Sequence, residues 1–532
     1  MRKIFGLAFY CLSFMFLAPF ALASPQSVVA GLFEEGAQAV EWRGVTIDLN
    51  KLKSYYVSDD AQFVWVENGA LTVAGQELVS ALGKAASDGL NPKDYTEIAF
   101  EALPNLSGEE DEAGAELALS QSFLRVARDL SGGRTSPSLT ATNIVIERKN
   151  IDAGKWLGIA RTSGTSAAFS TLRPRHGQYG KLRQLLAAYR NYEAIGGWDP
   201  VPAGPTLKPG MRDARVAAMR ASLAARGYKG LTTGEGSLYD PALLNAVKTF
   251  QLNNSVEDDG VVGKGTLAIL NIPVEARIRQ IIVNMERWRW LPNDLGARHV
   301  LVNQAGFELF LVDKGKTVDR RRVIVGKPFH ETPMFSDRIG YAEFNPTWTV
   351  SADIAKDEFL PKLLKDPGYL AANDYKIYSG WAEGAPEIDA YSVDWNSVTG
   401  KFPYRIVQQP GAKNALGVVK FMFPNKFNIY LHDTPSRQLF AKTGRAFSHG
   451  CIRVNKPMDF AEKLFGLDQN MSRAGLDAIV DSGQLTRVAL KSKVPVHLTY
   501  FTIWIGDDGR TAFHDDVYGR DAVVSDLIFR QS

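Results

Sequence analysis

Long uncharged stretches are absent from this 532-residue chain outside its first 23 residues. Arg2 and Lys3 are followed by the uncharged segment 4–23, and Ala21-Leu22-Ala23 before Ser24 is a typical cleavage pattern for an export signal. About 20 uncharged residues could also span a bilayer as an uncut anchor. We predict a cleaved signal peptide over residues 1–23, an exported chain, and membrane attachment only through an uncleaved leader.

Cysteine is nearly missing, with Cys11 and Cys451 as its two occurrences. Cys11 lies in the leader and leaves with it, so the mature chain can form no internal disulfide. Exported compartments oxidise thiols, and a single thiol there is a liability unless it is buried or used. Cys451 is therefore either a small buried apolar residue or a reactive group.

An excess of charge of one sign is also absent. Removing Arg2 and Lys3 leaves 59 basic and 58 acidic residues. A nearly neutral chain excludes nucleic-acid binding as the main driving force, and we expect no nucleic-acid partner. With 45% apolar and 22% charged residues the composition is that of a globular protein, and the length predicts about three domains.

Residues 33–205 form a first region of mixed pattern with no catalytic constellation. Apolar spacing predicts helices over 76–88 and 116–130, and the prolines and glycines of 196–205 indicate a linker. Three aromatic residues are predicted to belong to its core: Tyr55, Tyr56 and Trp65.

Residues 206–272 have the pattern of a compact helical unit. Asp240-Pro241 is a helix start, and Asp259-Gly260 with Gly263 marks turns. The pattern resembles the peptidoglycan-binding domain of the three-helix type, with Ser255 where that domain usually has glycine. The alternative is a helical spacer that binds nothing.

Segment 273–297 is predicted as a connection, with a helix over 274–290 whose apolar stripe includes Ile278 and Ile282. Its arginines are predicted to form a solvated face, and contact with an acidic wall polymer is the alternative. They are Arg277, Arg279, Arg287 and Arg289.

From residue 298 to 532 the pattern changes to strands, with a hairpin signal at 304–306. Polar residues 351–410 interrupt them, and an insertion of this length beside strands is usually functional, such as a lid. Residues after about 485 are predicted to form a closing strand. The whole chain is therefore predicted to be a multi-domain α+β protein with mainly helical N-terminal domains.

A candidate catalytic constellation lies at 430–453. Tyr430 and His432 share one face of a strand, and Cys451 follows Gly450, which lets a substrate approach the backbone closely. An adjacent imidazole activates a thiol nucleophile and later protonates a leaving amine. The Tyr430 hydroxyl and the Cys451 N–H could stabilise an oxyanion. A backbone carbonyl, or the weaker candidate Asp433, would orient His432.

This segment resembles the L,D-transpeptidases, whose motif is a His followed by Ser/Thr-His-Gly-Cys-x-Arg/Asn. The matching residues are His432, Ser448, His449, Gly450, Cys451 and Arg453. Further likeness extends through 325–327, 332–333, 345–348, 366–369 and 431–435. Segments 88–92 and 284–292 also resemble the large Gram-negative type of this family. That type has a scaffold domain, which would be residues 33–205 here, a peptidoglycan-binding domain and a capped catalytic domain. Ser351 replaces a usual proline, and we expect this to alter only a loop.

The resemblance implies a periplasmic enzyme of cell-wall biogenesis that needs no cofactor or metal. Cys451 would attack the third stem residue's carbonyl, release D-alanine and form a thioester, which a neighbouring stem amine would convert into a 3→3 cross-link. His432 would be the general base and acid. Ser448 and His449 would support the loop, while Arg453 and Trp348 would bind substrate; for Arg453 a structural ion pair is the alternative. The resemblance also implies acylation of the cysteine by carbapenems.

Three alternatives remain open. His432, His449, Cys451 and Asp433 could be zinc ligands of a peptidase, although their spacing fits no common zinc signature. The chain could be a wall-binding scaffold with an inactive domain. The acceptor could be water, a lipoprotein lysine or a D-amino acid, giving an L,D-carboxypeptidase, an anchoring enzyme or exchange. Stem peptides and glycan are the predicted partners, with room for other wall-synthesis proteins.

The other five histidines have no motif around them and are predicted to be structural or exposed, with His330 near the cleft. They are His176, His299, His330, His497 and His514.

Overall fold

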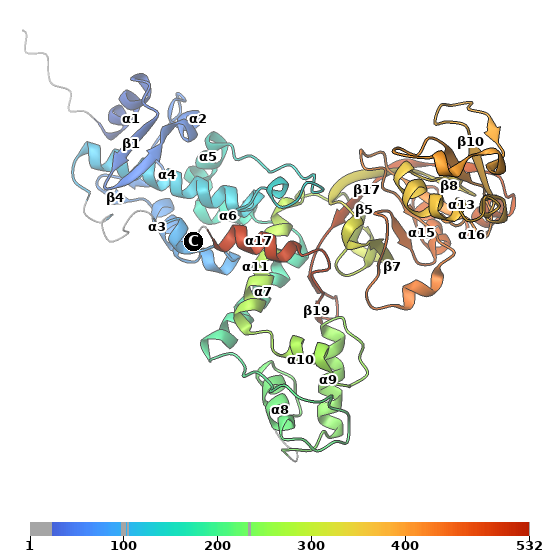
Figure 1. The fold of residues 1–532 in the computed structure, drawn as a ribbon. Coiled ribbons are helices and arrows are strands. Elements are labelled where there is room, and N and C mark those ends of the chain that lie inside the picture. Colours follow the sequence, from blue (N-terminus) through green and yellow to red (C-terminus); the bar gives the residue numbers. More distant parts are fainter. Residues whose placement is uncertain (1–23, 97–102, 104–105, 232–235, 531–532) are drawn as a thin grey trace, which may run out of the picture. The chain divides into compact units, whose positions relative to one another are not determined.

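The computed structural model describes residues 24–530 apart from 97–102, 104–105 and 232–235, so the predicted leader lies outside the described residues. The chain divides into two compact units. The first contains the described residues of 1–84, 92–127 and 151–171, and the second contains 85–91, 128–150 and the rest from 172 onward. Figure 1 labels the elements of both.

The first unit is built around the long helix α4 (Glu109–Gly132), whose final turn belongs to the second unit. Two hairpins and short helices accompany it: α1 (Pro25–Glu34), β1 (Ala39–Trp42), β2 (Val45–Asp48), α2 (Lys53–Tyr56), β3 (Val66–Glu67), β4 (Ala70–Leu71), α3 (Val73–Gly83), α5 (Ala153–Ser163) and α6 (Thr165–Leu172). The buried Glu116 carboxylate accepts hydrogen bonds from three successive backbone N–H groups, at residues 64–66. Tyr55, Tyr56 and Trp65 are buried, which confirms their predicted place in the core.

The second unit includes the three helices predicted for 206–272. They are α8 (Arg215–Ala225), α9 (Pro241–Asn253) and α10 (Lys264–Leu270). The Asp240 side chain accepts the Leu243 N–H at 2.8 Å and caps α9, as the sequence indicates. Ser255 has φ +56°, the left-handed conformation that favours the glycine it replaces.

Helix α11 (Val274–Trp290) has the predicted bounds, but of the four arginines predicted to form a solvated face only Arg279 is exposed. Arg277, Arg287 and Arg289 are buried. Arg289 forms an ion pair with the fully buried Glu286, whose other oxygen accepts the N–H and hydroxyl of Thr135. Helix α11 packs against α7 (Gly177–Ala194), and all of its residues from 281 to 290 are buried. A helix surrounded by protein has to pair its charges internally, and spacing alone does not reveal this.

A nine-stranded sheet forms the core of the β-rich region (Figure 1). Its strands run in the order β15 (Ala446–Ser448), β7 (Lys316–Gly326), β16 (Ile452–Val454), β14 (Leu431–His432), β13 (Val419–Met422), β8 (Phe335–Phe344), β17 (Thr486–Thr499), β5 (Arg298–Asn303) and β6 (Glu308–Asp313). Strand β6 also pairs with β7, so eight of the strands close on themselves. The enclosed core is covered by α15 (Pro457–Gln469) and α16 (Arg473–Asp481).

The predicted hairpin at 304–306 joins β5 to β6 in antiparallel pairing. The strand predicted to carry both Tyr430 and His432 is wrong for Tyr430 and the residues before it, because only Leu431 and His432 form β14. There the Asn425 side chain binds the backbone of Phe427 and Ile429, so a side chain replaces a neighbouring strand as hydrogen-bond partner.

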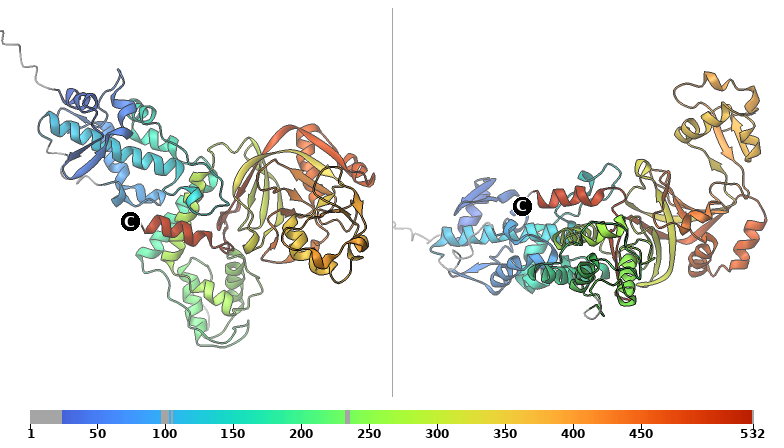
Figure 2. Two further views of the ribbon diagram at one scale, coloured as in Figure 1. Left: turned by 45° about the horizontal axis from the view of Figure 1, so that its top comes forward. Right: turned by 60° about the horizontal axis from the view of Figure 1, so that its bottom comes forward.

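The insertion at about 351–410 has a core and a sheet of its own, which sequence reasoning missed. The strands run in the order β11 (Glu387–Ile388), β10 (Tyr375–Tyr378), β12 (Arg405–Gln408) and β9 (Trp348–Thr349). Its helical part comprises α12 (Ala352–Ile354), the π-helix η7 (Ala355–Phe359), α13 (Leu360–Leu363) and α14 (Tyr369–Ala372). Ser351 accepts the Ile354 N–H and caps α12. Figure 2 shows the insertion, in yellow-orange, as a lobe standing out from the sheet.

The C-terminal part differs from a single closing strand. Strand β17 lies inside the sheet, between β8 and β5, and a separate hairpin of β18 (Ile503–Ile505) and β19 (Thr511–Phe513) follows. Helix α17 (Arg520–Phe529) ends the described chain. None of the helices in the described part is long and apolar enough to cross a membrane.

Candidate active site

The predicted site residues meet at a cavity of about 810 Å³ between the sheet and the insertion. The sheet contributes Tyr430, His432 and Arg453, together with the turn that carries Ser448, His449 and Cys451. The insertion side contributes Trp348, Glu358 and Trp381. Gly450 belongs to the same turn, so the structure brings all eight predicted site residues together.

Strand register determines which side chains share the cavity. His432 pairs with Arg453 on β16 and with Lys420 on β13, and Lys420 pairs in turn with Glu343 on β8. Paired residues point to the same face. Leu431 points the other way into the core. A row of charge therefore crosses four strands, with the imidazole between two cations.

The turn before Cys451 is held by side-chain hydrogen bonds. The Ser448 hydroxyl donates to the Cys451 carbonyl at 2.5 Å and accepts the Gly450 N–H at 3.1 Å. The buried Thr332 hydroxyl donates to the Gly450 carbonyl at 2.7 Å. Gly450 has φ +113°, and a Cβ there would lie 3.2 Å from the Ile429 side chain. The turn therefore requires glycine, and its carbonyls are fixed before any substrate binds.

The group that orients His432 is a backbone carbonyl. The His432 Nδ1 lies 2.5 Å from the carbonyl oxygen of Asp433. A carbonyl only accepts, so Nδ1 carries the proton and Nε2 has the free lone pair. The Asp433 carboxylate accepts the Val418 N–H and pairs with Arg437 at 3.6 Å. Of the two candidates considered from sequence, the carbonyl therefore has the position and the carboxylate does not.

Both predicted reacting groups are uncharged at neutral pH. Burial raises the pKa of the Cys451 thiol to about 11, against hydrogen bonds from Tyr430 and the charges of Arg453 and Lys420. Burial also lowers the pKa of His432 to about 3, and the charge of Arg453 acts in the same direction. The thiol and the imidazole line the same cavity, and the thiol donates to the Asn428 carbonyl at 3.7 Å.

His449 faces the insertion and not Cys451. Its Nε2 lies 2.8 Å from the Glu358 carboxylate and 3.2 Å from the Lys327 amine. The His330 ring is 4.8 Å away between centroids, consistent with its predicted place near the cleft. Burial lowers the pKa of His449, and the Glu358 charge partly offsets this. The motif histidine thus connects the turn to the insertion.

Arg453 and Trp348 both line the cavity but differ in surroundings. Arg453 forms no ion pair with a carboxylate in the described part of the chain, and its Nε is buried without a hydrogen-bond partner. The structural ion pair considered for it is therefore not seen there. Trp348 packs against Phe359 and Tyr375 with ring centroids 6.3 Å apart in both cases, so it also belongs to the insertion's core.

Sequence reasoning missed several residues of the site. Lys420 forms an ion pair with Glu343 at 2.7 Å and lines the cavity beside His432. Glu358 and Thr332 hold the catalytic turn from distant segments. None of them belongs to a local motif; alternation along β13 places Lys420 on the exposed face, but only the pairing of strands shows what it faces. Among the described residues, no group of three His, Cys, Asp or Glu side chains is arranged to hold a metal ion.

Three family models match separate parts of the chain. The family model described as the L,D-transpeptidase catalytic domain matches residues 297–468, the scaffold domain matches 50–186, and the "Putative peptidoglycan binding domain" matches 212–270. The chain therefore matches the models of these three domains, which confirms the resemblance found in its motifs. Together with the sheet and helices, they also confirm a multi-domain α+β protein.

One curated relative is a protein of Haemophilus influenzae named "Putative L,D-transpeptidase". It is 32% identical over 252 residues, which are 47% of this chain. The match covers 50% of the relative, so the chain spans about half the length of that relative. Solved L,D-transpeptidases are only distantly similar. That of Stackebrandtia nassauensis is 15% identical, over 56% of this chain and 97% of that one, with a TM-score of 0.22. That of Mycobacterium smegmatis is 11% identical, over 38% and 58%, with a TM-score of 0.18.

Proposed function

We propose that this chain is a peptidoglycan L,D-transpeptidase that forms 3→3 cross-links through a cysteine thioester. The observation that carries the proposal is the arrangement of Cys451, His432 and Arg453 around one roofed cavity. A thiol, a base with a fixed tautomer and an unpaired guanidinium are the groups that acyl transfer from a carboxylate-bearing peptide requires. The peptidoglycan-binding domain supports the same substrate class.

In the acylation step the Cys451 sulfur attacks the carbonyl between the third stem residue and D-alanine. The thiol proton passes to Nε2 of His432, whose Nδ1–H stays bonded to the Asp433 carbonyl. The oxyanion accepts hydrogen bonds from the Tyr430 hydroxyl and the Cys451 N–H. His432 then returns the proton to the departing D-alanine amine, and a thioester remains. Arg453 holds the substrate carboxylate.

In the second step the side-chain amine of another stem attacks the thioester carbonyl. His432 takes a proton from that amine and returns it to the leaving sulfur, so the thiol is restored and an amide joins the two stems. The insertion shields the thioester from water. Water in place of the amine would give a carboxypeptidase.

The test is mass spectrometry of disaccharide-tetrapeptide monomers incubated with the mature protein and with Cys451→Ala. The expected product is a cysteine-dependent dimer that has lost one D-alanine. Tripeptide alone would indicate hydrolysis or a missing acceptor such as a lipoprotein lysine. No cysteine-dependent change on monomers or on intact sacculi would overturn the proposal in favour of a wall-binding scaffold.

The same chemistry leads to two further expectations. A carbapenem should form a covalent adduct on Cys451, seen as a mass increase in the wild type and not in Cys451→Ala. The substrate also requires export, so the chain should be recovered from the periplasm with residues 1–23 removed.

A further inference from the structure

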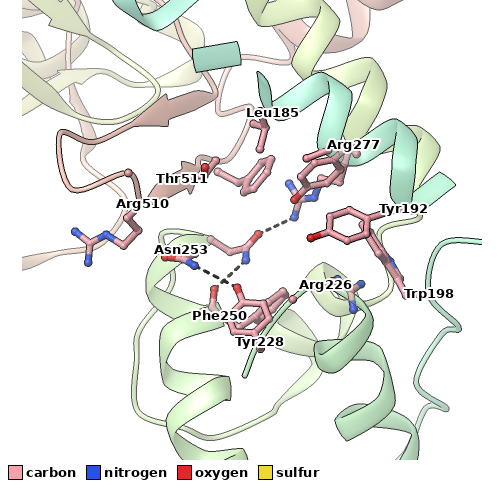
Figure 3. A pocket seen from close by; sticks show the side chains of 16 residues that line it. Leu185, Tyr192, Trp198, Arg226, Tyr228, Phe250, Asn253, Arg277, Arg510 and Thr511 are labelled. Carbon is pink, nitrogen blue, oxygen red and sulfur yellow. Dashed lines mark hydrogen bonds between the residues drawn. The ribbon is translucent and has the colours of Figure 1, made fainter. Parts of the chain in front are cut away.

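A second cavity, of about 320 Å³, lies away from Cys451 and is shown in Figure 3. Four segments of the second unit line it: helix α7 with the loop after it, the peptidoglycan-binding domain, helix α11, and the turn between β18 and β19. Six of its sixteen lining residues are aromatic. Trp198, Tyr192, Tyr228 and Phe250 are among them, with Tyr228 and Phe250 in edge contact at 6.1 Å.

Three arginines line this cavity; Arg510 pairs with Asp508 at 3.7 Å, and the other two are Arg226 and Arg277. Arg226 lies over the Trp198 ring, 4.0 Å from its centroid, and Arg277 lies 4.3 Å from that of Phe513. Each is held by neutral oxygens. Arg226 donates to the carbonyls of Ser222 and Leu270, and Arg277 donates to the Asn254 side chain at 2.7 Å. The ring faces and these oxygens fix both groups in place.

Neither guanidinium forms an ion pair with a carboxylate among the residues that the structure describes. Burial lowers the pKa of Arg226 to about 10, and the charge of Arg277 acts in the same direction. Asp515 acts on Arg277 only from beyond contact distance. Two desolvated like charges destabilise each other, and an anion between them would relieve this.

Further polar groups lie at the same place. The Asn253 amide donates to the Tyr228 hydroxyl at 3.2 Å, while its buried Oδ1 has no hydrogen-bond partner. The Tyr192 hydroxyl points toward the centre of the cavity (Figure 3). A ligand that has both an N–H group and a carboxylate would suit these groups. Its N–H could donate to the unpaired Asn253 oxygen, and its carboxylate could meet the two guanidiniums.

We propose that this cavity is a second binding site, which takes the free carboxylate end of a short wall peptide between Arg226 and Arg277. The volume is at the lower end for ligand pockets and suits about two residues. The carboxylate meets the guanidiniums, an amide N–H of the peptide meets Asn253, and the small apolar side chains lie on the rings. The identity of the ligand as a wall peptide rests on the proposed function; the anion site itself does not.

The test uses hydrogen–deuterium exchange and calorimetry on the mature chain, with N-acetyl-L-alanyl-D-alanine and its C-terminal amide as probes. The two probes differ only in the carboxylate. We expect the acid to protect segments 226–254 and 503–513 and to bind at least about tenfold more tightly than the amide. Arg277→Gln should abolish this difference. Arg279→Gln, which removes the same charge from the exposed face of α11, should retain it, as should Cys451→Ala.

Asn253→Asp keeps the side-chain shape and places a carboxylate beside the arginines. It should weaken binding of the acid at least about tenfold without loss of folding, which covers the case in which Arg277→Gln does not fold. Equal binding of acid and amide, or wild-type protection in both Arg277→Gln and Asn253→Asp, would overturn the proposal. Cross-linking is measured separately on soluble monomers. A chain that binds the acid at this cavity but forms no cross-link would overturn the proposed function and leave the anion site standing.

Discussion

Replacing Lys420 by methionine should raise the pKa of both Cys451 and His432. Lys420 and His432 are paired on neighbouring strands, and the amine lowers the pKa of both groups. For residues directly opposite on neighbouring strands, about 5 Å apart, and an effective dielectric constant of about 20, Coulomb's law gives about 3 kcal/mol. The Glu343 carboxylate, 2.7 Å from the amine, cancels part of this field. If about 1.4 kcal/mol of the interaction with the Lys420 charge remains, its removal shifts each pKa by about one unit.

The assay is the pH dependence of Cys451 alkylation by iodoacetamide, followed by intact mass. We expect the midpoint of Lys420→Met to rise by about one pH unit. The double variant Lys420→Met/Glu343→Gln should rise less, because it removes the carboxylate that the single variant leaves unpaired. Lys426→Met is the matched control: this lysine is exposed and does not act on either group, so its midpoint should equal that of the wild type.

A folded Lys420→Met variant with the wild-type midpoint would refute the reasoning. It would mean that solvent in the cavity screens the charge of Lys420, and that the pairing of β13 with β14 does not affect the pKa of the Cys451 thiol. A rise in the Lys426→Met control of the same size would mean that net charge, and not the position of Lys420, sets the midpoint.

Four further outcomes follow from single contacts. Glu286→Gln should lower the free energy of unfolding by about 3–5 kcal/mol in denaturant titration, because it leaves Arg289 as an unpaired buried charge. Gly450→Ala should slow carbapenem acylation in stopped-flow measurements, since alanine is strained at φ +113° by about 1–3 kcal/mol. Glu358→Gln should lower the pKa of His449 in an NMR titration, because the carboxylate charge raises it. Burial lowers the pKa of His497 to about 4, so its neutral form stabilises the fold above pH 6.5 and this stability is lost as the pH falls. At pH 5 the loss is about 2 kcal/mol, and His497→Gln should remove it from pH-dependent unfolding curves.

The candidate site could be predicted from sequence where its residues are close in the chain. The run from Ser448 to Arg453 combines a thiol, a glycine and a cation within six positions, and alternation places Tyr430 and His432 on one face. The caps and spacings of α9 and α11 are equally local, because a helix is determined by contacts three and four residues apart. Three domains and the family resemblance followed from such signals.

The rest depended on which segments pack together. The arginines of α11 look like a solvated face in the sequence and are buried in the structure, because burial is a property of what surrounds the helix. The insertion looked polar, yet strands β9 to β12 pair into a sheet with its own core. Lys420 lies beside His432 only through the pairing of β13 with β14.

The sequence by itself predicted the groups that we propose to react, since a candidate nucleophile and its base are recognised by residue types at short spacings. The tertiary structure alone decided their environment: the carbonyl that orients His432, the charges on both sides of it, the contact of Glu358 with His449, and the second cavity with its two arginines. The physical reason is that electrostatic fields and desolvation depend on distance in space. Apart from the carbonyl of Asp433, which follows His432 directly, these groups come from segments that are separated along the chain.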